Sequence, residues 1–271
     1  MFRKIMLYSL AMLLLIAAAC AKRHPVVNIN EDPSWKLAWS DEFSGPAIDT
    51  NIWNYEIGSQ YGGWGNNELE YYTSRPENAY IENGNLVIQA IKESYSGYEY
   101  TSARMITKGK MSRQYGKIEA SIKLPYGQGI WPAFWMMGDS YSWPACGEID
   151  IMEMTGGGDG RDNKCYGTGH WDDGGHQQSG GSITPVAWPV KLADTYHLFA
   201  VEWNASSIKW SVDGTSYFTL DITPSVRSEF HQPYFLLLNL AVGGNWPGVP
   251  DGTTVFPQKM YVDWVRWYVW E

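Results

Sequence analysis

Short strand-like runs separated by glycine and proline constrain the fold of this chain more than any other feature. β-Branched and aromatic residues recur in short, mostly alternating runs from Trp35 to Glu271, and the chain holds 28 Gly and 14 Pro. Pairs such as Asn83-Gly84 and Asp213-Gly214 predict tight hairpin turns between neighbouring strands. No segment of the mature chain shows the period of an amphipathic helix of ten residues. The pattern predicts an all-β sandwich of two antiparallel sheets.

One domain accounts for the chain beyond its N-terminal region. Residues 34–271 contain no internal repeat, linker or low-complexity tract that would divide them. We therefore predict a single catalytic or binding domain over 34–271.

The N-terminal region has the pattern of an export signal. Met1-Phe2-Arg3-Lys4 is positively charged, an apolar run follows, and Ala17-Ala18-Ala19-Cys20 ends it. A cysteine directly after small residues resembles the bacterial lipobox, in which the thiol is lipidated and becomes the mature N-terminus. We expect a signal peptide over 1–19, a lipidated Cys20 with a tether over 20–33, and a lipoprotein of the bacterial cell envelope. The alternative is an ordinary secretory signal and a secreted protein.

The charge of the chain limits its partners. There are 20 Lys+Arg against 29 Asp+Glu, a net charge of −9, and loss of Arg3 and Lys4 with the signal makes the mature chain more negative. Such a surface repels nucleic acid and gains nothing at an anionic membrane, so a membrane contact is expected only through the lipid. We expect a monomer whose partner is a neutral polymer. Aromatic residues, at 15%, supply flat apolar surfaces for packing or for ligand stacking.

Two cysteines remain in the mature domain, Cys146 and Cys165. If 146–154 and 165–171 pair as a hairpin, the two thiols lie about 20 Å apart, beyond disulfide reach. We expect two free, buried thiols.

The segment Glu148-Ile149-Asp150-Ile151-Met152-Glu153 gathers three acidic residues. In a strand Glu148 and Asp150 share one face, but regular alternation would send Glu153 into the apolar side, where a lone carboxylate costs several kcal/mol. A β-bulge at Ile151-Met152 returns Glu153 to the acidic face. The segment predicts three carboxylates in a row on a bulged strand.

This arrangement suits chemistry at a sugar carbon. Glu148 and Glu153 could bring their carboxyl groups within about 5–6 Å of each other, with Asp150 between them, which is the spacing of double displacement. Crowding of the three charges should raise at least one pKa, as an acid catalyst requires. The alternatives are a solvated acidic strand or a Ca²⁺ site.

Neighbouring residues favour a sugar-binding site. In the predicted hairpin His170 falls opposite Glu148, and Trp131, Ala133 and Trp135 share one strand face. Two indole rings on one face offer plates on which the C–H faces of sugars can stack.

Four further segments complete a recognisable pattern: WSDEF at 39–43, NNELEYY at 66–72, GQGIWPAFWM at 127–136 and LNLAVGGNWPG at 238–248. With the bulged acidic segment, they make the chain resemble glycoside hydrolase family 16, in its laminarinase-like branch of endo-β-1,3(4)-glucanases. The resemblance covers essentially the whole mature chain.

The resemblance implies a β-jelly roll of the concanavalin A-like lectin/glucanase class, with substrate across its concave sheet. It implies Glu148 as nucleophile, Glu153 as general acid/base, and Asp150 as the residue that tunes the nucleophile. The implied sugar contacts are Asn66, Arg104, Trp131, Trp135, His170 and, on the leaving side, Trp246. For Arg104, a salt bridge at the rim is the alternative.

The resemblance also bears on metals. It implies no cofactor for catalysis, and a structural Ca²⁺ on the convex face held by the backbones of Glu42 and Gly84 and by Asp263. Oxygen-only ligation suits such a hard cation.

One segment departs from the pattern. Residues 169–181 (GHWDDGGHQQSGG) are predicted to form a long polar loop over the cleft, in which His176 and Gln178 either contact sugar or are solvated.

The predicted function is a retaining endo-β-glucanase acting on β-1,3-glucan such as laminarin, on mixed-linkage β-1,3/1,4-glucan, or on both. The same fold acting on agarose, porphyran or carrageenan, and a non-catalytic β-glucan-binding protein, are the alternatives.

Overall fold

The computed structural model describes residues 35–158, 160–187 and 189–271. The predicted signal peptide, Cys20 and the tether lie outside the described residues. Within the described part of the chain, no helix is long and apolar enough to cross a membrane.

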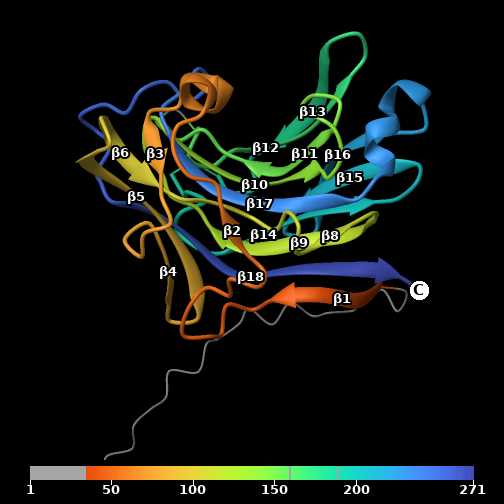
Figure 1. Ribbon diagram of the computed structural model, residues 1–271, viewed down its shortest axis with the longest axis horizontal. Coiled ribbons are helices and arrows are strands. Elements are labelled where there is room, and N and C mark those ends of the chain that lie inside the picture. Colours follow the sequence, from red (N-terminus) through yellow and green to blue (C-terminus); the bar gives the residue numbers. More distant parts are fainter. Residues whose placement is uncertain (1–34, 159, 188) are drawn as a thin grey trace, which may run out of the picture. The chain divides into compact units, whose positions relative to one another are not determined.

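The domain is a sandwich of two sheets, as the sequence predicted (Figure 1). The ten strands of the outer sheet are β1 (Trp35–Asp41), β3 (Glu70–Tyr72), β4 (Ala79–Glu82), β5 (Asn85–Tyr95), β6 (Tyr98–Ser102), β9 (Gly116–Lys123), β14 (His197–Trp203), β15 (Ser207–Val212), β16 (Thr215–Asp221) and β18 (Gln258–Trp270). The eight strands of the inner sheet are β2 (Asn54–Tyr55), β7 (Arg104–Ile106), β8 (Ser112–Arg113), β10 (Ile130–Gly138), β11 (Glu148–Glu153), β12 (Cys165–Asp172), β13 (His176–Ile183) and β17 (Tyr234–Val242). Two short helices, η1 (Gly63–Asn67) and η2 (Ser225–His231), complete the described part.

Strand order places the site. The inner sheet runs β13-β12-β11-β10-β17-β7-β2, so β11 lies between the β13 edge and the β7–β2 edge. Figure 1 shows this sheet curving over the outer one, with the β12–β13 hairpin rising at one side and β3, β6 and η1 at the other. The concave face between these two walls is the predicted substrate face.

The main core lies between the sheets and anchors β11 from below. Ile149, Ile151 and Met152 are buried in it with at most 1% of their surface exposed. Trp210 of the outer sheet donates a hydrogen bond from its Nε1 to the backbone oxygen of Asp150, at 2.7 Å. Gly167 of β12 admits this indole, because a Cβ there would lie 2.2 Å from a ring carbon of Trp210.

The predicted turns and thiols are confirmed. Asn83-Gly84 and Asp213-Gly214 all have positive φ, between 49° and 78°, as a type I′ turn requires. Cys146 and Cys165 are free and buried, and burial raises their pKa values to about 11 and about 12. These thiols are therefore inert at neutral pH.

The prediction of a long loop over 169–181 is wrong. The segment is a β-hairpin in which β12 and β13 pair without interruption from Cys165↔Ile183 to Asp172↔His176. The turn closes where the Asp172 carboxylate accepts a hydrogen bond from the Gly175 amide at 2.7 Å. β13 looks like a loop in sequence because it is the edge strand of the sheet and is mostly solvated.

Candidate active site

The acidic strand contains the predicted bulge. Trp135 of β10 pairs with Asp150, while its neighbour Phe134 pairs with Met152, so Ile151 is the extra residue. On the other side the β11–β12 register shifts between Asp150 and Glu153. The insertion keeps the apolar side chains in the core and returns Glu153 to the face of Glu148 and Asp150.

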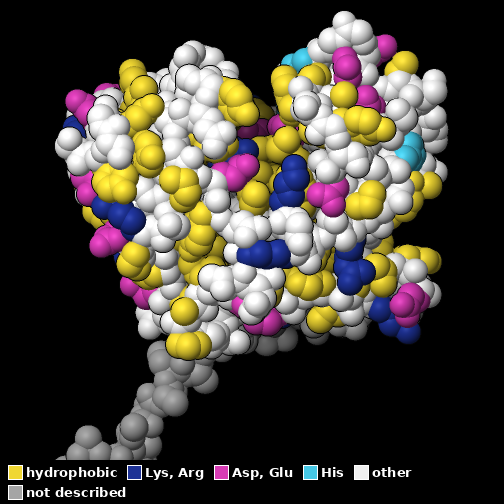
Figure 2. Space-filling model, viewed as in Figure 1, with side chains coloured by type: hydrophobic (Ala, Val, Ile, Leu, Met, Phe, Trp, Pro, Cys, Tyr) yellow, Lys and Arg dark blue, Asp and Glu magenta, His cyan; other side chains and the backbone are white. Residues whose placement is uncertain are grey.

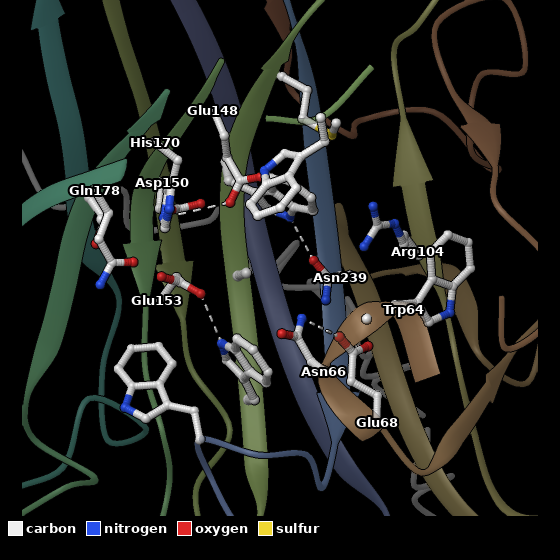
Figure 3. Close-up of a pocket in the computed structure, with 18 of the residues that line it drawn as sticks. Trp64, Asn66, Glu68, Arg104, Glu148, Asp150, Glu153, His170, Gln178 and Asn239 are labelled. Atoms are coloured by element: carbon white, nitrogen blue, oxygen red, sulfur yellow. Dashed lines mark hydrogen bonds and ion pairs between the residues drawn. The ribbon is translucent and has the colours of Figure 1, made fainter. Parts of the chain in front are cut away.

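The three carboxylates open into a cleft of about 1320 Å³ on the concave face. Figure 2 shows the hollow between two raised walls, and Figure 3 shows Glu148, Asp150 and Glu153 along one strand with their side chains on the same side. The floor beside them is apolar, because Ala133, Trp135 and other side chains of β10, β17 and β7 form a second buried cluster there.

His170 joins the carboxylate cluster from β12. It pairs with Glu148 in the register, as predicted, and its Nε2 lies 2.9 Å from Asp150 Oδ2 and 3.8 Å from Glu148 Oε1. Its Nδ1 lies 2.8 Å from Nε2 of His176 on β13. The imidazole therefore fixes the carboxylate that separates the two glutamates.

Burial raises the pKa values of all three acids, and the charges of neighbouring acids add to this effect for Glu148 and Glu153. Burial and the charge of Asp150 raise the pKa of Glu148 to about 8, and burial raises that of Asp150 to about 7. Glu148 and Asp150 lie close enough to titrate as a coupled pair rather than as two independent acids. Burial and the charges of Asp150 and Glu148 raise the pKa of Glu153 well above its usual range, which keeps it protonated as an acid must be.

Trp131 contacts the predicted acid directly. Its Nε1 donates a hydrogen bond to Glu153 Oε1 at 3.0 Å, and this bond lowers the pKa of Glu153 against the effects that raise it.

Trp131→Phe should therefore move the alkaline limb of the kcat/KM profile upward. Without the indole N–H the ionised carboxylate loses a donor, the pKa of Glu153 rises further, and the acid stays protonated to higher pH, by about 0.5–1 unit. The profile of kcat/KM between pH 5 and pH 10 measures this. A downward shift of that limb would contradict the assignment of Glu153 as the acid.

Across the cleft from His170, Arg104 is held in an aromatic cage. Its guanidinium lies 4.4 Å from the Trp64 ring centroid and 4.7 Å from that of Trp135. It also forms a salt bridge with Glu56, and it lines the cleft, so a contact with sugar stays a prediction for Arg104. Asn66 lines the same wall (Figure 3).

A buried polar network under this wall was not predicted. Trp135 Nε1 donates to Asn239 at 2.7 Å, Asn239 donates to the Tyr72 hydroxyl at 3.0 Å, and Tyr72 donates to Glu68 at 3.1 Å. Asn66 also donates to Glu68, at 3.2 Å. The network ties two predicted sugar contacts, Trp135 and Asn66, to one buried carboxyl.

Glu70 lies next to this network and is fully buried. Burial and the charge of Glu68 raise its pKa well above the usual range, and its Oε2 accepts the amide hydrogen of Val242 at 2.6 Å. A protonated Glu70 satisfies both neighbours, because its hydroxyl can donate to Glu68.

Glu70→Gln should leave the free energy of unfolding within about 1 kcal/mol of wild type, because a carboxamide keeps one acceptor and one donor. Glu70→Ala should cost about 2–4 kcal/mol, because it leaves a cavity and strands the Val242 amide. Urea unfolding at pH 7 compares the two variants. Equal losses in both would contradict a protonated Glu70.

Trp246 lies at the other end of β11. It packs edge-on against Trp131, at 5.5 Å between centroids, and against Tyr166 of β12, at 4.9 Å. It remains 42% exposed and lines the cleft. All six predicted sugar contacts thus lie around the carboxylates.

Two places bear on metal binding. Glu148, Asp150 and His170 offer ligand atoms that all lie within 4.8 Å of one another, so the acidic cluster could hold a cation. The predicted calcium ligands lie elsewhere, in or beside the outer sheet, where Asp41 pairs with Val265 and Leu86 with Val262. Residue 42 directly follows β1 and residue 84 directly precedes β5, and this register brings both near Asp263 in the middle of β18. Calcium there stays a prediction.

The family follows from the comparisons. Residues 66–266 match the family described as Glycosyl hydrolases family 16. The chain belongs to glycoside hydrolase family 16. It is 41% identical over 256 residues to the β-glucanase of Rhodothermus marinus, covering 88% of this chain and 86% of that one. It is 43% identical over 246 residues to the clotting factor G alpha subunit of Tachypleus tridentatus, covering 88% of this chain but only 35% of that longer protein.

A solved structure agrees in fold. The laminarinase catalytic domain from Thermotoga maritima matches with a TM-score of 0.78 and 47% identity, over 87% of this chain and 98% of that one. This family member is thus an all-β glycoside hydrolase with its acidic strand on the concave sheet.

Proposed function

We propose that this protein is a retaining endo-β-glucanase that hydrolyses β-1,3-glucan such as laminarin, mixed-linkage β-1,3/1,4-glucan, or both. The bulged strand carries the proposal, because Ile151 puts Glu148, Asp150 and Glu153 on one face of β11 in a cleft. The β-glucanase and laminarinase relatives support the substrate class.

In the first step Glu148 attacks the anomeric carbon while Glu153 protonates the departing glycosidic oxygen. The bond to that oxygen breaks and a glucosyl ester forms on Glu148. In the second step Glu153, now ionised, takes a proton from water, whose oxygen attacks the same carbon and releases Glu148. Asp150 is held by His170 at 2.9 Å. When Asp150 is protonated it stabilises the ionised carboxylate of Glu148, and when it is ionised it stabilises the neutral ester.

Product analysis on laminarin, barley β-glucan and agarose, side by side, tests the proposal. Release of a series of oligosaccharides from laminarin or barley glucan, with none from agarose, is the expected result. Cleavage of agarose alone would replace glucan by a galactan, and binding to laminarin without any product would make the protein a non-catalytic receptor.

We also propose that Cys20 is lipidated and holds the enzyme at the bacterial cell envelope. The run of small residues before Cys20 supports this. Cys20→Ala should release the protein from the membrane fraction into the soluble one. If the amount of protein in the membrane fraction is the same for Cys20→Ala as for wild type, Cys20 does not anchor the enzyme.

We further propose that the backbones of Glu42 and Gly84 and the side chain of Asp263 bind a structural Ca²⁺. The Glu42 carboxylate is engaged with Arg266, at 2.9 Å through both oxygens, which is consistent with a backbone role for Glu42. Thermal unfolding, measured once with added calcium and once with a chelator, compares the calcium-bound protein with the calcium-free protein.

A further inference from the structure

Trp143 presents an unusually exposed indole at the rim of the cleft. It belongs to the connection between β10 and β11, five residues before Glu148, and 48% of its surface is exposed. It lines the same cleft as the carboxylates. None of the predicted sugar contacts includes it.

The indole is fixed in place rather than loose. Its ring centroid lies 4.6 Å from that of His176, which in turn stacks on His170 at 5.0 Å and 17°. His176 and His170 also share a hydrogen bond of 2.8 Å, and His170 bonds Asp150. A chain of contacts therefore runs from the rim to the catalytic strand, and a ring held in advance loses little entropy on binding.

The surroundings of Trp143 suit an uncharged ligand. Burial and His170 lower the pKa of His176, which keeps its ring neutral near pH 7. Gln178, opposite His170 in the register, lines the cleft on the same strand as His176 and adds a carboxamide that can donate and accept. An apolar plate beside neutral hydrogen-bonding groups matches the C–H face and hydroxyls of a pyranose.

Strand order shows which end of the cleft this is. His176 and Gln178 belong to β13, at one edge of the inner sheet, whereas Arg104 belongs to β7 toward the other edge. β11 with its carboxylates lies between them. A glucan that crosses the strands and contacts both ends is therefore cut between them.

We propose that Trp143, backed by His176 and flanked by Gln178, is a binding platform for one glucosyl unit of the substrate, on the opposite side of the cleaved bond from Arg104. This subsite deepens the proposed function and rests on it. It makes the β12–β13 hairpin a determinant of where along the chain the enzyme cuts.

Trp143→Ala, assayed on reducing-end-labelled laminari-oligosaccharides of increasing length, tests the platform. We expect kcat/KM to fall about tenfold for chains long enough to reach Trp143, with little change for the shortest cleaved chain. The main cleavage position should also move toward one end of the labelled chain. Trp143→Phe should restore the wild-type position. An unchanged cleavage pattern, or an equal loss at every length, would overturn the proposal.

Trp270→Ala is the matched control, because Trp270 is 60% exposed at the end of β18, in the outer sheet. It should leave both length dependence and cleavage position unchanged. Thermal unfolding of each variant separates loss of fold from loss of the subsite.

A binding assay separates this proposal from the proposed function. If the wild type cleaves no β-glucan, the function fails, and calorimetry with laminari-oligosaccharides still tests the platform. Weaker binding by Trp143→Ala than by wild type supports it, and equal binding overturns it.

Discussion

Glu148→Gln should lower kcat on laminarin by at least about 10⁴-fold, because no covalent glucosyl intermediate can form without the nucleophilic carboxylate. The carboxamide has the same shape and adds no charge to a buried cluster. The fold should therefore be kept, and circular dichroism and thermal unfolding check this. Initial rates of reducing-sugar release measure the loss.

Added azide distinguishes loss of the nucleophile from loss of binding. With the Glu148 side chain shortened to Ala, azide can attack the anomeric carbon directly and give a glucosyl azide of inverted configuration. Recovery of cleavage with this product supports Glu148 as nucleophile. Wild-type activity in Glu148→Gln would contradict the assignment outright.

Glu153→Gln should lower kcat on laminarin by about 10²–10⁴-fold, because the departing sugar oxygen then leaves without a proton. The loss should depend on the leaving group. An aryl β-glucoside oligomer with an acidic phenol needs no such proton in the first step, so its glucosyl-enzyme should form at a nearly normal rate and then accumulate.

Burst kinetics with the aryl substrate give the control for Glu153. A burst of phenol followed by slow turnover is expected from Glu153→Gln, whereas Glu148→Gln should give no burst. An equal loss on laminarin and on the aryl substrate would show that Glu153 does not act as the acid.

The acidic strand could be predicted because its geometry depends only on residues that are close in sequence. The two-residue period and the cost of burying a charge are enough to require a bulge between Asp150 and Glu153, and the hairpin pairing places His170 opposite Glu148. Alternation likewise placed Trp131 and Trp135 on one face. Each inference needed only neighbours along one or two strands.

What could not be predicted depends on contacts between distant segments. Asn239 bonds Tyr72 across a separation of 167 residues, and in sequence both look like ordinary polar strand residues. Glu68 and Glu70 are both buried, although glutamate side chains are rarely buried without a partner. Nothing in NNELEYY alone reveals that this segment forms and supports one wall of the cleft.

The edge strand shows a second limit. Glycine and polar residues in 169–181 predicted a loop, yet backbone pairing with β12 makes a regular strand of its second half. Such pairing satisfies the backbone whatever the side chains are, and edge strands are commonly polar. The sequence does not mark Trp143 as a sugar contact, because its position beside His176 depends on the pairing of this strand.

Proton NMR of the sugar first released from a laminari-oligosaccharide tests the double displacement at Glu148 and Glu153 most directly. Spectra recorded in the first minutes, before mutarotation, report the anomeric configuration of the new reducing end. The two-carboxylate mechanism predicts the β-anomer first, with the α-anomer appearing only as the sugar equilibrates. Initial release of the α-anomer would contradict it, because a single displacement would then cut the bond.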